Sequence, residues 1–133
     1  MGQTRVTVEV RNIKGGRKSW DSLFLVDTGA TDCLIPRSAL KRLGVTVEGQ
    51  VDGELADGSV RVFDYGFVRV RFMGQETVCH AVFGPEEAEP LLGVVALENT
   101  GIAVDPKTHS LKRLHAKSLK SVRGRASHPL ERR

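Results

Sequence analysis

The chain has 133 residues, of which 40% are hydrophobic and 27% are charged, and its net charge at pH 7 is +4. This length suits one domain with one hydrophobic core. No apolar run is long enough to cross a bilayer, and the first residues lead into an alternating pattern rather than an apolar signal region. We therefore expect a cytoplasmic protein that does not contact a membrane.

The positive charge belongs to one end of the chain. Residues 112–133 hold eight Lys and Arg against Glu131 alone, a net charge of +7, which leaves −3 for residues 1–111. The end of the chain also has few apolar residues and several Ser, Gly and Pro residues, a composition typical of mobile extensions. We predict a domain over residues 1–114 and a flexible basic tail over 115–133, and any contact with nucleic acid would involve the tail only.

The first half of the chain reads as short strands and one short helix. Apolar residues alternate with polar ones over 6–10, which predicts a strand, and a Gly-Gly turn leads to a second strand over 19–26. A short apolar strand at 33–36 stops at a proline. Residues 38–43 then have a helical pattern, with Ser38 as the expected N-cap and Gly44 as the stop.

The second half continues in the same way. Residues 50–72 predict a long hairpin, because Asp57-Gly58 is a strong turn signal, and a further strand is expected over 77–83. A polar loop at 84–90, with solvated glutamates, precedes a short helix over 94–99 and a terminal hairpin formed by 102–104 and 110–114. Many short strands with two short helices predict an all-β fold, a small closed β-barrel.

The motif with the most chemical content is Asp27-Thr28-Gly29-Ala30, which follows the apolar run 23–26. Asp-Thr-Gly is also a common turn tripeptide. Its position favours a functional role, since four consecutive apolar residues predict a strand buried on both faces that ends in a carboxylate. Thr28 can hydrogen-bond a backbone group, Gly29 permits a sharp turn, and Ala30 leaves the floor of a cleft open.

A carboxylate in this setting fits amide hydrolysis by activated water. Two carboxylates about 3 Å apart cannot both ionise, so they share one proton. The ionised carboxylate then accepts a proton from water, while the protonated one donates to the carbonyl oxygen. The motif occurs once, so we predict a homodimer in which each subunit supplies one Asp27.

The order of three elements resembles that of the retropepsin-like single-domain aspartic peptidases, and is most similar to their bacterial and archaeal members. These elements are the strand that ends in Asp27-Thr28-Gly29-Ala30, the hairpin tip Ala56-Asp57-Gly58, and Leu91-Leu92-Gly93 before a short helix. The resemblance covers about residues 4–114. It implies an acid-protease β-barrel that acts as a symmetric homodimer on peptide or protein substrates, with Asp27 as the catalytic residue.

The resemblance also implies roles for the other elements. Residues 56–58 would form the tip of a flap that closes over an extended peptide, and residues 91–93 would support the catalytic loop from behind. The chain termini often form the dimer sheet in this family, which makes 6–10 and 110–114 candidates. Thr31 and Asp32 stand where viral members have acidic residues, and Val94 replaces an arginine that often follows the glycine.

Other sites have less support. The four histidines have no metal-binding spacing, so we expect neither a metal nor another cofactor. Cys33 and Cys79 are isolated and are expected to be buried free thiols. Two alternatives stay open: a non-catalytic peptide-binding or assembly module on the same barrel, and a small barrel that binds nucleic acid through the tail. The negative charge of residues 1–111 and the few aromatic residues oppose the second.

Overall fold

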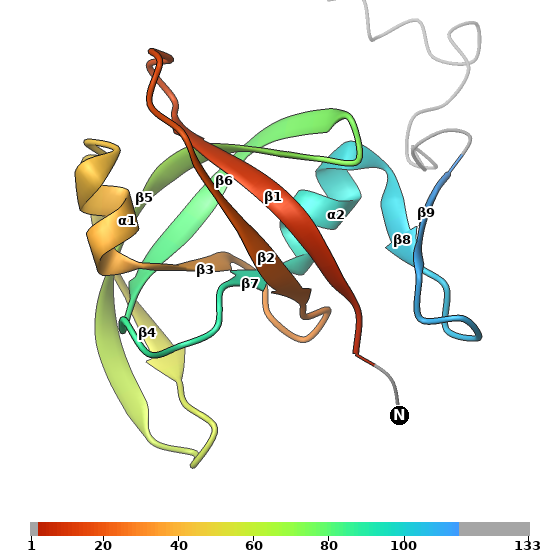
Figure 1. The fold of residues 1–133 in the computed structure, drawn as a ribbon. Coiled ribbons are helices and arrows are strands. Elements are labelled where there is room, and N and C mark those ends of the chain that lie inside the picture. The colour runs from red at the N-terminus through yellow and green to blue at the C-terminus, as the bar shows by residue number, and fades with distance from the viewer. Residues whose placement is uncertain (1–2, 115–133) are drawn as a thin grey trace, which may run out of the picture.

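A computed structural model describes residues 3–114, and the basic tail predicted for 115–133 lies outside this range. The chain forms mostly strands with two short helices, as predicted (Figure 1). In chain order the elements are β1 (Arg5–Asn12), β2 (Trp20–Val26), β3 (Cys33–Pro36), α1 (Arg37–Arg42), β4 (Gly49–Glu54), β5 (Val60–Phe72), β6 (Gln75–Gly84), β7 (Leu91–Leu92), α2 (Val94–Thr100), β8 (Ile102–Val104) and β9 (Leu111–Arg113).

The strands close into a barrel. The main sheet has the order β1-β2-β7-β3-β6-β5-β4, and β5 also pairs with β1, which closes the ring and leaves β4 attached outside it. The pairs β2–β7 and β3–β6 are parallel, and the remaining pairs of the ring are antiparallel. The predicted closed β-barrel is therefore confirmed, and the closure depends on a pairing between residues about 60 apart in sequence.

The barrel interior is filled by side chains from one face of each strand in the ring. Alternate residues point inward, so the buried side chains follow the period-two pattern read from the sequence. Burial of this apolar surface is the main source of stability. The largest fully buried side chains come from five strands and α1: Phe24, Ile35, Leu40, Leu92, Val8, Val10, Val68, Val70 and Cys33.

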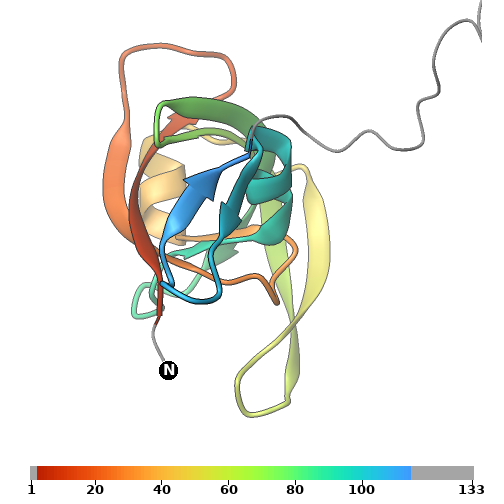
Figure 2. The same ribbon diagram turned by 90° about the vertical axis from the view of Figure 1, so that its right-hand side faces the viewer.

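A second, two-stranded sheet lies beside the barrel. Strands β8 and β9 pair only with each other, and Figure 2 shows them across the front of the barrel next to β1. The Thr4 hydroxyl donates a hydrogen bond to the carbonyl of His109, and the amide of Leu114 donates to Gly101. Isolated two-stranded sheets are marginal in water, so the bond from Thr4 helps to hold the hairpin against the barrel, while the bond from Leu114 extends the pairing of β8 with β9.

The start of α1 differs from the sequence prediction. The helix begins at Arg37, its N-cap is Pro36, and Ser38 lies inside the first turn, so the prediction of Ser38 as the N-cap was wrong. The amide and hydroxyl of Ser38 both donate to the carboxylate of Glu86, at 2.8 and 2.6 Å. These bonds lower the pKa of Glu86. The loop at 84–90, which was expected only to be solvated, thus supplies a hydrogen-bond acceptor to the first turn of α1.

Candidate active site

The Asp27 carboxylate lies at the end of β2 and is held by its own turn. One carboxylate oxygen, Oδ1, accepts a hydrogen bond of 2.9 Å from the amide of Gly29, and the amide of Ala30 donates to the carbonyl of Asp27. The amide of Asp27 donates to the carbonyl of Leu92 at 3.0 Å. Among the side-chain hydrogen bonds of the described residues, Oδ2 takes no part, so this oxygen is free to meet water or a second carboxylate.

The loop that carries Asp27 is bounded on its inner side by β7 and α2. Strand β7 pairs in parallel with the end of β2, with Leu25 opposite Leu91 and Val26 opposite Leu92. The first amides of α2 then donate to loop carbonyls, Val94 to Ala30 at 2.8 Å and Val95 to Thr31 at 3.3 Å. Helix α2 has no side-chain N-cap, so the loop carbonyls take the place of a capping side chain.

Gly93 lies where β7 meets this loop. A Cβ atom at residue 93 would lie 2.5 Å from the carbonyl oxygen of Asp32 and 2.6 Å from that of Thr31. The backbone of residue 93 is extended, with φ −86°, so glycine is needed here for space and not for an unusual conformation. The structure thus places residues 91–93 directly behind the loop that carries Asp27.

The hairpin of β4 and β5 extends away from the barrel (Figures 1 and 2). At its tip the amide of Leu55 donates to the carbonyl of Ser59, and the amide of Gly58 donates to the carbonyl of Leu55. Gly58 has φ +87°, a conformation that favours glycine. The residues predicted as a flap tip, Ala56, Asp57 and Gly58, are all exposed at this turn.

Asp57 stabilises this turn instead of facing a partner elsewhere. Its Oδ1 accepts hydrogen bonds from the hydroxyl of Ser59 at 2.6 Å and from the amide of Ser59 at 2.9 Å. These two bonds lower the pKa of Asp57. The contribution of the carboxylate to the turn is therefore present above the ordinary pKa of an aspartate and is lost as the pH falls through the lowered value.

Ser59→Ala is expected to raise the pKa of Asp57 toward the ordinary range, because the substitution removes the hydroxyl donor and keeps the backbone donor. An NMR titration of the Asp57 carboxyl carbon in both proteins measures the change. Asp105 is the matched reference, since its carboxylate accepts backbone amides in a different turn. An unchanged Asp57 titration would show that the hydroxyl bond does not form in solution.

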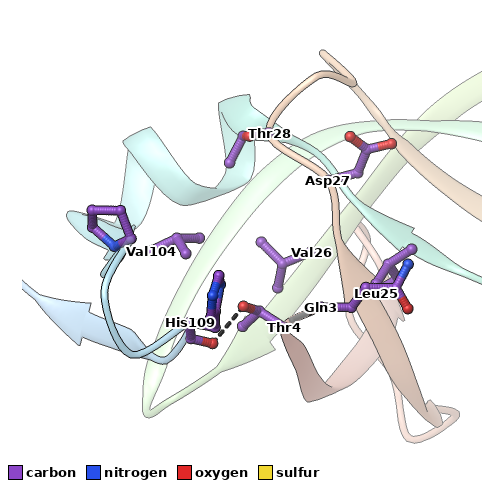
Figure 3. Close-up of a pocket in the computed structure, with 9 residues that line it drawn as sticks. Gln3, Thr4, Leu25, Val26, Asp27, Thr28, Val104 and His109 are labelled. Carbon is purple, nitrogen blue, oxygen red and sulfur yellow. Dashed lines mark hydrogen bonds between the residues drawn. The ribbon is translucent and has the colours of Figure 1, made fainter. Parts of the chain in front are cut away.

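A concave surface opens beside the loop that carries Asp27. It has a volume of about 580 Å³ and is bordered on one side by the end of β2 and on the other by the turn between β8 and β9. Figure 3 shows Val26, Val104 and His109 facing the same space, with Thr28 and Asp27 at its edge. The lining residues are Gln3, Thr4, Leu25, Val26, Asp27, Thr28, Val104, Pro106 and His109.

A row of half-buried apolar side chains crosses the outside of the barrel. Residues directly opposite each other on paired strands share one face of the sheet, and the registers connect Leu25 to Leu91, Leu91 to Leu34, Leu34 to Val82, and Val82 to Tyr65. All five are partly exposed. The row runs from the strand that ends in Asp27 to the base of the β4–β5 hairpin, which is where an extended peptide would need apolar contacts.

Sequence reasoning missed one cluster next to this row. His80 stacks on Tyr65 with ring centroids 4.8 Å apart and meets Phe67 edge-on at 4.6 Å. Its Nδ1 atom lies 3.8 Å from Oδ1 of Asp32, which is five residues beyond Asp27. The sequence signal was available in part, because His80 is opposite Phe67 in the hairpin register, but nothing local connects His80 to Asp32.

Cys33 and Cys79 are buried and do not form a disulfide, as predicted, although their sulfur atoms lie 3.8 Å apart. A hydrogen bond to Cys33 and burial raise the pKa of the Cys79 thiol.

Among residues 3–114, no three His, Cys, Asp or Glu side chains are arranged to bind a metal ion. Neither helix in this part of the chain has the length and apolar character that a membrane span requires.

Comparison with curated proteins finds no significant match. Comparison with protein families, in contrast, agrees with the features described above. The family model described as aspartyl protease matches residues 6–95, which is about two thirds of the chain. The matched range includes the Asp27 motif, the β4–β5 hairpin and Leu91–Gly93. The chain therefore belongs to the aspartyl protease family.

Proposed function

We propose that this protein is an aspartic endopeptidase that acts as a homodimer, with one Asp27 from each subunit. The proposal rests on the position and the hydrogen bonding of the Asp27 carboxylate. Its carboxylate lies at the end of a strand, one carboxylate oxygen is fixed by the amide of Gly29, and the residue lines an open concave surface. The intact motif favours catalysis over binding alone, because a protein that only binds peptides has no need of two adjacent carboxylates.

In this mechanism the two Asp27 carboxyl groups share one proton across the dimer axis. The ionised group accepts a proton from a water molecule, and the oxygen of that water attacks the carbonyl carbon of the scissile peptide bond. The protonated group donates its proton to the carbonyl oxygen. Collapse of the tetrahedral intermediate then releases the amine, which receives a proton from a carboxyl group.

The surrounding elements support an extended peptide as the substrate. The apolar row formed by Leu25, Leu91, Leu34, Val82 and Tyr65 can contact large apolar side chains near the scissile bond. The β4–β5 hairpin can close over the peptide and exclude water from the reacting groups. Its exposed tip is held by hydrogen bonds within its own turn, so it can move without breaking bonds to the barrel.

Cleavage of an unbiased peptide mixture tests the proposal, with the full chain assayed from acidic to neutral pH over a wide range of protein concentration. We expect cleavage beside large apolar residues, and a specific activity that rises with concentration as dimers form. Cleavage that the Asp27→Asn variant retains would contradict the proposal. Peptide binding without cleavage by a folded dimer would instead identify a binding module on this barrel.

A further inference from the structure

Cys33 and Cys79 form a buried pair of thiols that the proposed mechanism does not use. Cys33 is the first residue of β3, and Cys79 lies in β6, the strand that pairs with β3 in parallel. Cys33 is opposite Ala81, so Cys79, two residues earlier, is its diagonal neighbour. Both side chains point into the barrel, where they are 1% and 6% exposed. The chain has two cysteines, and the fold brings both of them together.

The geometry of this pair suits a covalent bond between the two sulfur atoms. The sulfurs lie 3.8 Å apart, close enough for a hydrogen bond between the thiols. A disulfide bond is about 2.05 Å long, so the two atoms need to approach by less than about 2 Å. A structural metal ion needs more ligands than this pair offers. Among residues 3–114, no group of three His, Cys, Asp or Glu side chains completes such a set.

The surroundings of the two thiols give them different roles. A hydrogen bond with Cys79 lowers the pKa of Cys33, and a hydrogen bond from the backbone of Gly93 acts in the same direction, against the opposing effect of burial. The bond to Cys33 and burial both raise the pKa of Cys79. A thiolate, and not a thiol, attacks an oxidant. Cys33 is therefore the residue that reacts first, and Cys79 is the residue that resolves the product.

We propose that Cys33 and Cys79 are a site of reversible oxidation, at which a peroxide converts the two thiols into a disulfide within one chain. Hydrogen peroxide is small, and local opening at β3, a strand of four residues, gives it access to Cys33 without global unfolding. The site gives a chemical role to two side chains that otherwise only fill the core.

The reaction takes place in two steps. The Cys33 thiolate attacks one oxygen of hydrogen peroxide, the O–O bond breaks, hydroxide leaves, and Cys33 becomes a sulfenic acid. The sulfur of Cys79 then attacks the sulfur of Cys33, the S–O bond breaks, and the hydroxyl group leaves as water with the proton of the Cys79 thiol. The two sulfur atoms together lose two electrons. The peroxide gains these electrons and the two thiol protons, which gives two molecules of water.

The position of Cys33 connects this oxidation to the loop between β2 and β3. Cys33 directly follows Thr31 and Asp32, whose carbonyl oxygens border the space at Gly93. The carbonyl of Thr31 also accepts the amide of Val95 at the start of α2. Movement of Cys33 toward β6 therefore pulls on the segment that joins this loop to α2. We expect the disulfide form to have a kcat/KM at least about tenfold lower, because small displacements of reacting groups reduce rates strongly. This effect on activity rests on the proposed function, whereas oxidation of the pair does not.

Intact mass spectrometry of the full chain tests the site. The reduced protein is treated with hydrogen peroxide under native conditions, and free thiols are then alkylated in denaturant. We expect the oxidised chain to lose the mass of two hydrogen atoms and to take up no alkylating reagent. Dithiothreitol should restore two alkylated cysteines and the peptidase activity. Peptide mapping should recover one cross-linked pair that contains Cys33 and Cys79.

Three variants test the order of the steps and the effect on activity. Cys79→Ala removes the resolving thiol, so Cys33 should stop at the sulfenic acid, which dimedone labels. Cys33→Ala should lose this labelling, because burial keeps the pKa of Cys79 raised. The double variant is the matched control for activity, since peroxide also oxidises methionine, and its kcat/KM should not respond to treatment. Circular dichroism shows whether the variants fold, and the mass of the wild-type chain decides the question if they do not.

The outcomes separate this inference from the proposed function. A disulfide that forms in a folded chain supports the site, even if no peptide is cleaved and the peptidase proposal fails. Thiols that can still be alkylated after treatment, or a disulfide between two chains on a nonreducing gel, overturn the site even if cleavage requires Asp27. Disulfide formation no faster than global unfolding, measured by hydrogen exchange, also overturns it. An oxidised chain with unchanged kcat/KM overturns the connection to the loop between β2 and β3.

Discussion

Asp27→Asn is expected to lower kcat/KM for peptide cleavage by about a thousandfold, the typical contribution of general acid–base catalysis. The amide cannot share a proton with the partner carboxylate or accept one from water. The fold should remain, because the side-chain oxygen can still accept the amide of Gly29 and the backbone bond to Leu92 does not involve the side chain. Steady-state kinetics with a cleaved peptide measures the loss.

Two comparisons complete this experiment. Asp21→Asn makes the same change at an exposed position on the same strand, and kcat/KM should stay unchanged. Mixtures of wild-type and Asp27→Asn subunits, allowed to exchange, test the pairing directly. If each active dimer needs both carboxylates, activity falls with the square of the wild-type fraction. A fall that is linear or shallower would mean that a mixed dimer with one Asp27 is active.

Gly93→Ala is expected to destabilise the protein by about 3 kcal/mol, the upper end of the range of about 1–3 kcal/mol that is typical when a well-packed core is overfilled. The added methyl group would lie within 2.7 Å of three backbone atoms of Thr31 and Asp32. Backbone atoms cannot rotate away as a side chain can, so β7 and the loop that carries Asp27 would have to separate. Urea unfolding monitored by circular dichroism gives the free energy of unfolding.

Gly49→Ala is the matched control for this change. Its added methyl group would also be crowded, at 3.0 Å, but only by the ring of Tyr65. That side chain is half-buried and can shift, so we expect a loss below about 1 kcal/mol. A Gly93→Ala variant as stable as Gly49→Ala would show that the loop and β7 are not packed as tightly as the structure indicates.

The local parts of the fold were predictable from short segments. Asp57-Gly58 predicted the β4–β5 turn, and Gly44 predicted the end of α1, where its φ is +74°. Both follow from backbone preferences of glycine that act within a few residues. The N-cap of α1 was mispredicted for the opposite reason. Ser38 bonds to Glu86, 48 residues away, and no local pattern contains that contact.

The candidate site could likewise be predicted only in its local features. The prediction that residues 23–26 form a strand buried on both faces was wrong, because Leu23 is 53% exposed and only Phe24 is fully buried. The sequence by itself determined that Asp27 follows a strand, that the motif occurs once, and that a hairpin and an apolar pair with glycine follow in order. Those features are carried by residue type and by spacing along one segment. The sequence also determined the closed all-β architecture in outline, since alternating polarity specifies strands with one buried face.

Only the tertiary structure decided which segments meet around Asp27. Strand register placed Leu25, Leu91, Leu34, Val82 and Tyr65 in one row, and it set His80 beside Asp32. The docking of the β8–β9 turn through Thr4 created the concave surface beside the end of β2. These contacts join residues distant along the chain, and their free energy depends on packing that no single segment specifies.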